Sequence, residues 1–91
     1  MQDSVQDFVP PKPPKSFRVV IELFKSAKRL DNVLLAALKA QNENLDLREI
    51  TRTKFKDLFT SGRIQIKGQK AGPSSAIAKG FTYVDILGYQ N

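Results

Sequence analysis

The sequence predicts a small α+β domain with two helices and three strands, following a proline-rich start. Two observations predict this class. Apolar residues alternate with a period of two near both ends of the domain, which is typical of strands, whereas between these ends they recur at the spacing of a helix. A chain of 91 residues has room for one such domain with a small core.

Residues 1–16 are predicted to be a disordered, proline-rich leader, and residues 17–91 the folded domain. The leader contains the run Val9-Pro-Pro-Lys-Pro-Pro14. Prolines remove backbone donors and favour the polyproline II conformation, so this run indicates a tail or a stiff spacer. Pro11 and Pro14 also fit the PxxP pattern that SH3-like grooves bind. Contact between Pro10–Pro14 and a protein partner is therefore the alternative role.

A strand and then a helix are predicted at the start of the domain. The segment Phe17–Phe24 is rich in β-branched and aromatic residues, and its alternate positions are apolar. The segment Leu30–Gln41 then changes to helical spacing. Asp31 lies in its first turn, where a carboxylate is favoured by the helix dipole. The apolar stripe of this helix consists of Leu30, Val33, Leu34, Ala37 and Leu38.

A second, shorter helix is predicted after Thr51. The preceding segment Leu45–Ile50 has no clear period, and it forms either a connector or a further helical turn. The Thr51 hydroxyl suits the N-cap, where it can accept from a free backbone N–H. Gly62 suits the left-handed position just past the helix end. The buried stripe is expected to be Phe55, Leu58 and Phe59.

The last third of the chain predicts two strands separated by a loop. Arg63–Lys67 alternates, with Ile64 and Ile66 facing inward and the polar residues outward. Gly68–Ser75 is rich in turn-forming residues. The final strand is expected at Phe81–Leu87, with Val84 and Ile86 in the core. Phe81 and Tyr83 share the opposite face of this strand, where they either stack on bases or pack under the first strand.

Positive charge is concentrated in the middle of the chain. The net charge is +6, and residues 48–79 alone carry eight Lys or Arg against two acids. The segments on either side are nearly neutral. A basic block of this kind is the electrostatic footprint of a nucleic-acid-binding surface.

Several classes of function are disfavoured by composition. The chain has no Cys and no His, which excludes disulfides, thiol nucleophiles and imidazole ligands or bases. No pairing among the remaining reactive groups stands out, so we expect no enzyme activity, no cofactor and no metal. No apolar run approaches the ~20 residues that span a bilayer, and the start lacks a signal-peptide core. We therefore expect a soluble, cytoplasmic and complete small protein without a membrane partner.

An ordered series of short motifs resembles the S-four RNA-binding domain, also called the alpha-L motif. That family includes ribosomal, pseudouridine synthase, tyrosyl-tRNA synthetase and small ribosome-associated heat-shock proteins. The match covers about two-thirds of the chain. It consists of Arg29-Leu-Asp31 followed by Val33-Leu34-Leu35, then Thr51-Arg52, and then Phe55-Lys56-x-Leu58-Phe59-x-x-Gly62-Arg63-Ile64-x-Ile66-x-Gly68. The closing strand of the family corresponds to Gly80–Ile86. The segment Phe17–Phe24 before these motifs is similar to the arrangement in the pseudouridine synthase branch.

The chain departs from the family pattern at three places. Thr51 stands where the family has Ser before the Arg of helix two, and Lys67 replaces the Asn of an Asn-Gly turn. The gap between Asp31 and Arg52 is also longer than usual, with Gln41–Arg48 as the apparent insertion. The first change conserves a cap, the second adds a cation, and the third alters the surroundings of the first helix.

The resemblance implies a fold and a binding surface. The fold is two packed helices against a short, mostly antiparallel sheet of three to four strands. Family contacts with RNA come mainly from the start of helix two and from the strand and loop that follow. Carried to matching positions, they imply a surface of Arg52, Lys56, Arg63 and Lys67, with Lys70 nearby and Lys54 as either a contact or a flanking charge.

The resemblance thus predicts a non-catalytic module that docks on structured RNA, either ribosomal RNA or tRNA. Two alternatives remain. The first is a protein-interaction adaptor on the same fold, which binds an acidic partner or uses the leader. The second is an unrelated α+β DNA-binding domain. The plain alternative for the cations is that they only solvate the surface. Arg29 and Asp31 are expected to serve the structure, through an ion pair or at a helix end.

Overall fold

The computed structural model describes residues 9–89, over which the chain folds into three helices and four strands. The α+β class predicted from the sequence is confirmed. The helices precede most of the sheet in the chain, because only the first strand comes before them. The elements are β1 (Ser16–Leu23), α1 (Leu30–Ala40), α2 (Leu45–Arg48), α3 (Arg52–Thr60), β2 (Ile64–Ile66), β3 (Gln69–Lys70) and β4 (Gly80–Leu87).

The four strands form one antiparallel sheet in the order β1-β4-β2-β3. β4 lies in the interior of the sheet and pairs along its whole length with β1, from Ser16 opposite Leu87 to Leu23 opposite Gly80. On its other side β4 pairs with β2 only over residues 84–86. Within the described residues, the first half of β4 therefore has a strand partner on one side alone.

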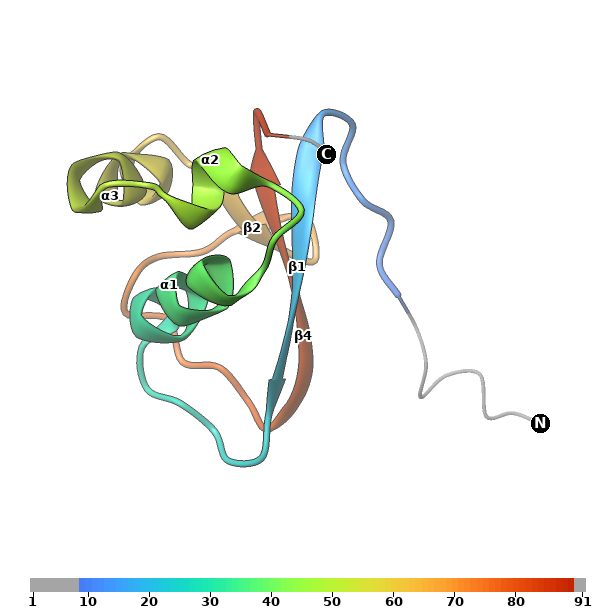
Figure 1. Cartoon of the computed structure of the whole chain (residues 1–91). Helices are drawn as coiled ribbons and strands as arrows, with labels where there is room; N and C mark the ends of the chain where they lie inside the picture. Colours follow the sequence, from blue (N-terminus) through green and yellow to red (C-terminus); the bar gives the residue numbers. More distant parts are fainter. Residues whose placement is uncertain (1–8, 90–91) are drawn as a thin grey trace.

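All three helices cover one face of the sheet, whereas residues 9–15 run along the other face (Figure 1). The core lies between the helices and the sheet. Alternate residues of β1 point into it, as the period of two predicted, and Leu30, Leu34 and Leu38 of α1 are fully buried. Each of the three residues predicted for the α3 stripe is buried, and so are Val84 and Ile86 of β4.

Both predicted ends of α3 are confirmed. The Thr51 hydroxyl accepts a hydrogen bond from the Lys54 backbone N–H at 3.2 Å. At the other end, Gly62 adopts a left-handed conformation with φ of 74°. Its N–H donates to the carbonyl of Phe59, and the N–H of Arg63 donates to that of Leu58. This pair of bonds is a Schellman motif, which ends the helix and turns the chain toward β2.

The β2–β3 hairpin differs from the prediction in two respects. The strand expected at 63–67 is confined to Ile64–Ile66, and the loop expected at 68–75 contains β3. The reason lies in the two-residue turn between the strands, where Lys67 and Gly68 both have positive φ, at 54° and 78°. Two positive φ values are typical of the turns that match the twist of a hairpin. The chain therefore reverses at Lys67 instead of extending through it.

The segment between the two long helices contains the short helix α2. The Asn44 side chain caps it by accepting from the Leu47 N–H, and Leu47 is fully buried. Gln41 ends α1, since its side-chain amide donates to the Leu38 carbonyl and accepts from the backbone of the following turn. The further helical turn left open by the sequence is thus present.

The chain ahead of β1 is attached to the domain. Residues 1–8 of the predicted leader lie outside the described residues. Pro10 is buried, and its carbonyl accepts from Arg18 Nη1 at 2.6 Å. The Ser16 hydroxyl donates to the Pro13 carbonyl, and the Gly88 N–H donates to that of Lys15. The segment nearest the domain therefore lies against the face of the sheet that the helices leave open.

Candidate nucleic-acid interface

Six exposed cations follow one another along α3 and the β2–β3 hairpin, and we call them the basic band. All six are residues that the sequence analysis selected. Within residues 9–89 none of their side chains forms an ion pair. Their charge is therefore not neutralised by the described part of the fold. The basic band consists of Arg52, Lys54, Lys56, Arg63, Lys67 and Lys70.

The charges of α3 run against its dipole. In α1 and α2 the first turn holds an acid and the last turn a base, which is the favourable arrangement. α3 has no acid in its first turn and no base in its last, and it begins instead with Arg52 and Lys54. Because the N-terminus of a helix already carries partial positive charge, these cations raise the local potential further. An anion bound there would be stabilised by both sources.

Arg52 and Lys56 share a groove between α1 and α3. They are four residues apart, so they project from the same side of the helix. The groove has a volume of about 720 Å³ and is also lined by Arg29 and Asp31 at the start of α1. Leu35, Phe55 and Phe59 add apolar surface to its lining. The structure thus brings three cations, one of them paired with an acid, to one hollow.

Arg29 and Asp31, which line this groove, form an ion pair with each other. The sequence left open an ion pair or a role at a helix end for these residues. Arg29 Nε lies 3.2 Å from Asp31 Oδ1, and Nη2 lies 3.1 Å from Oδ2. The hydrogen bonds from Arg29 hold the pKa of the Asp31 carboxyl below its usual value. The Asp31 N–H donates to the Pro73 carbonyl, which ties the loop after β3 to the start of α1. The pair orders the groove while half of Arg29 stays exposed.

The other cations of the basic band lie outside this groove. Lys54 is on the opposite flank of α3, where it lines a shallow hollow with Arg63. The Lys70 side chain crosses the helix end, because a Cβ placed on Gly62 would lie 2.9 Å from Lys70 Cδ. Lys67 is at the hairpin turn and lines a third hollow. The band therefore wraps around the end of α3 and continues onto the hairpin.

One pair of charged residues was missed by the sequence analysis. Arg18 of β1 and Asp85 of β4 face each other in register, and Asp85 is only 1% exposed. The Arg18 guanidinium carbon also lies 5.3 Å from the centre of the Tyr83 ring. The hydrogen bond to Asp85 raises the pKa of Arg18. The sequence does show opposite charges at outward positions of two predicted strands. To predict the ion pair from them, one must also know that the two strands pair and in which register.

The basic band thus places exposed positive charge on three neighbouring hollows of the surface. No group of three or more acids in residues 9–89 is placed to hold a metal ion. In the same range, every helix is too short or too polar to cross a membrane. No family model, curated protein or solved structure matches the chain.

Proposed function

We propose that this protein is a non-catalytic RNA-binding module that docks on folded RNA, either ribosomal RNA or tRNA, through the basic band. One observation carries the proposal. Six exposed cations lie together along α3 and the adjacent hairpin, and none of them forms an ion pair with an acid among the described residues. Two acids lie near the band, since Asp31 lines the groove of Arg52 and Lys56, and Asp57 lines the hollow of Lys54 and Arg63. Among the described residues, neither forms an ion pair with a cation of the band.

The chemistry of the band suits a phosphate backbone. Each Lys or Arg that neutralises a phosphate releases condensed counterions, and this release drives binding at low salt. Arg52 and Lys56 in the α1–α3 groove are one helical turn apart, so they can hold neighbouring phosphates. Arg52 also lies in the first turn of α3, where the positive end of the helix dipole strengthens the attraction.

Folded RNA is the preferred partner for two reasons. A-form RNA hides its base edges in a deep major groove, so proteins bind it largely through its shape, its 2′-hydroxyls and its phosphates. A rigid surface of cations fits that mode. The resemblance of Arg29-Leu-Asp31, Thr51-Arg52 and the segment 62–68 to the S-four RNA-binding domain gives independent support. The two long helices on an antiparallel sheet agree with the alpha-L arrangement, which we propose as the finer description of the fold.

The test compares two double charge reversals in the whole chain. The first variant, Arg52→Glu with Lys56→Glu, reverses the two cations of the groove. The control, Lys25→Glu with Lys39→Glu, changes the net charge equally at two exposed lysines that do not line the groove. Each protein is titrated with a blunt-ended RNA hairpin and with a DNA duplex of the same sequence. Melting curves establish that each variant is folded.

The proposal predicts that wild type prefers the RNA hairpin, that the groove variant loses RNA affinity by roughly a factor of 100, and that the control loses much less. An equal loss in both variants would show that only net charge matters. Equal binding of DNA and RNA would favour the DNA-binding alternative. If wild type binds neither at low salt, the adaptor alternative replaces this proposal, and a pull-down with the proline-rich leader present and deleted becomes the next step.

A further inference from the structure

The open face of the sheet is covered at one end and bare at the other. Arg18 and Asp85 occupy the covered end, where the Pro10 segment lies over them. Toward the bare end, Glu22 and Tyr83 share this face with two exposed apolar side chains. These are Val20, which is 50% exposed, and Phe81, which is 65% exposed. A phenyl ring exposed to that extent contributes little to the core. Its position is therefore better explained by a partner that residues 9–89 do not supply.

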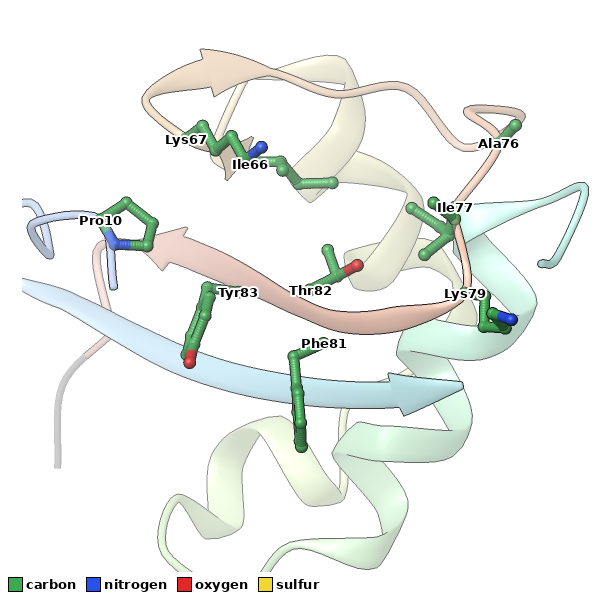
Figure 2. A pocket seen from close by; sticks show the side chains of 10 residues that line it. Pro10, Ile66, Lys67, Ala76, Ile77, Lys79, Phe81, Thr82 and Tyr83 are labelled. Carbon is green, nitrogen blue, oxygen red and sulfur yellow. The ribbon is translucent and has the colours of Figure 1, made fainter. Parts of the chain in front are cut away.

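A hollow lies near this bare end, beside the part of β4 that does not pair with β2, and two lysines line it. The hollow has a volume of about 610 Å³ and arises because β2 stops at Ile66, opposite Val84. Lys67 borders it from the hairpin turn and Lys79 from the chain just before β4 (Figure 2). Both are exposed, and neither forms an ion pair with any residue between 9 and 89. The hollow thus has a positive rim next to an exposed aromatic ring.

The backbone of Lys67 adds an independent observation. Its φ of 54° lies in the left-handed region, which Gly and Asn adopt more readily than a long side chain. Lys67 and Lys15 are the two non-glycine residues between 9 and 89 in this region. The two-residue hairpin turn requires a positive φ at this position, whichever residue occupies it. A lysine here places a cation on the rim of the hollow, at a cost in backbone energy that an asparagine would avoid.

We propose that this surface binds an unpaired stretch of the RNA, with a base stacked on the Phe81 ring and the adjoining phosphates held by Lys67 and Lys79. We call these three residues the stacking site. Bases present a π-face of any sequence, so stacking on an aromatic side chain needs no hydrogen-bond code. The inference rests on the proposed function, since it assigns a second contact for the same ligand.

Neighbouring side chains decide where the nucleotide lies. Tyr83 points in the same direction as Phe81 from β4, but its ring is already engaged by Arg18 and half-buried (Figure 2). Phe81 is therefore the ring available for stacking. Glu22 faces Phe81 across the β1–β4 pair, so it repels phosphate from the β1 side. The lysines attract phosphate from the opposite side, which fixes the path of the backbone along the hollow.

The experiment uses two RNA probes with the full-length chain. One is the blunt-ended hairpin, and the other is the same hairpin with a short uridine extension that carries one 2-aminopurine, whose fluorescence falls when it stacks. We expect the extension to tighten binding and its fluorescence to be quenched. In Phe81→Leu the affinity for the extended hairpin should fall by about tenfold, toward that of the blunt hairpin, and the quenching should disappear.

Matched variants test each part of the site. Phe24→Leu removes a phenyl ring that is 84% exposed but does not line the hollow, so it should change neither affinity nor quenching. Lys79→Gln should weaken binding of the extended hairpin and leave the blunt hairpin unaffected. Glu22→Gln should strengthen binding of the extended hairpin. Melting curves check that all four variants keep the wild-type fold.

The outcomes separate the two proposals. If the blunt hairpin binds and the extension adds nothing, or if Phe81→Leu behaves like Phe24→Leu, the stacking site is wrong while the basic band stands. If neither hairpin binds to wild type, both proposals are wrong. Sedimentation of the free protein gives one further outcome. A dimer that Phe81→Leu dissociates would mean that a second copy of the chain covers this face, and would overturn the nucleotide assignment.

Discussion

Arg18 on β1 and Asp85 on β4 join the two longest strands through a two-pronged ion pair, with Nε 2.7 Å from Oδ1 and Nη2 2.9 Å from Oδ2. The same guanidinium donates from Nη1 to the Pro10 carbonyl at 2.6 Å. One side chain therefore connects β4, β1 and the chain ahead of β1. Because Asp85 is almost fully buried, its carboxylate depends on this pairing for stability.

Removal of the Asp85 charge should destabilise the fold. In Asp85→Asn the Arg18 guanidinium, which is 14% exposed, is left without its counter-charge, and we expect a loss of about 3 kcal/mol in the free energy of unfolding. Urea denaturation measures it. Glu22→Gln is the control, because it makes the same kind of change at an exposed position of the same face and should stay within about 0.5 kcal/mol of wild type. Equal effects of the two substitutions would refute the structural role of the pair.

Gly62 should resist substitution because of its backbone. Its φ of 74° disfavours any side chain, and a Cβ there would also force Lys70 to move. We expect Gly62→Ala to lower the free energy of unfolding by about 1 to 2 kcal/mol. Gly72→Ala provides the comparison, since the nearest atom to a Cβ at Gly72 is 3.9 Å away and its φ is not positive. Equal melting temperatures of the two alanine variants would contradict this role of Gly62.

Arg52 should affect stability and binding in opposite directions. Arg52→Glu places an acid in the first turn of α3, which the helix dipole favours, so the free protein should gain about 0.5 kcal/mol. The same change removes a proposed phosphate contact, so affinity for the RNA hairpin should fall. Arg52→Gln should be intermediate in both measurements. A loss of stability in Arg52→Glu would instead mean that Arg52 serves the fold.

Substitution of Lys67 should also raise stability while it weakens RNA binding, for a different reason. Lys67→Asn puts a residue that accepts left-handed φ before Gly68, and we expect a gain in stability of up to about 1 kcal/mol. Binding of the extended hairpin should weaken, because a cation is lost. Lys70→Asn removes an equal charge from β3, outside the positive-φ turn, and should bring no such gain. If Lys67→Asn destabilises the protein, the turn is not strained by its lysine.

The long elements could be predicted because their residues carry a period that packing then uses. β1, α1, α3 and β4 each present an apolar side that is visible in the sequence, and Thr51 and Gly62 mark the ends of α3. α2 and β3 could not be placed, since four and two residues are too few to show a period. Both depend on tertiary contacts, such as the burial of Leu47 under α1 and the pairing of Gln69 with Ile66.

The candidate site, like the fold, could be predicted only in part from the sequence. Sequence identifies the cations of the basic band, because charge is a property of the residue. It cannot tell that Arg52 and Lys56 share a groove with Arg29, while Lys54 joins Arg63 on the other flank of α3. It also left open whether Phe81 stacks or packs. The exposure of Phe81 depends on how far β2 and the Pro10 segment extend, which residue types alone do not reveal.

The most direct test of the RNA-docking surface is the salt dependence of hairpin binding. For wild type, the logarithm of the association constant should fall with the logarithm of salt concentration at a slope of several units. Arg52→Gln with Lys56→Gln should reduce that slope by about 1.5 to 2, one increment for each lost phosphate contact. An unchanged slope, or no RNA binding by wild type at low salt, would contradict the claim that this groove holds the RNA backbone.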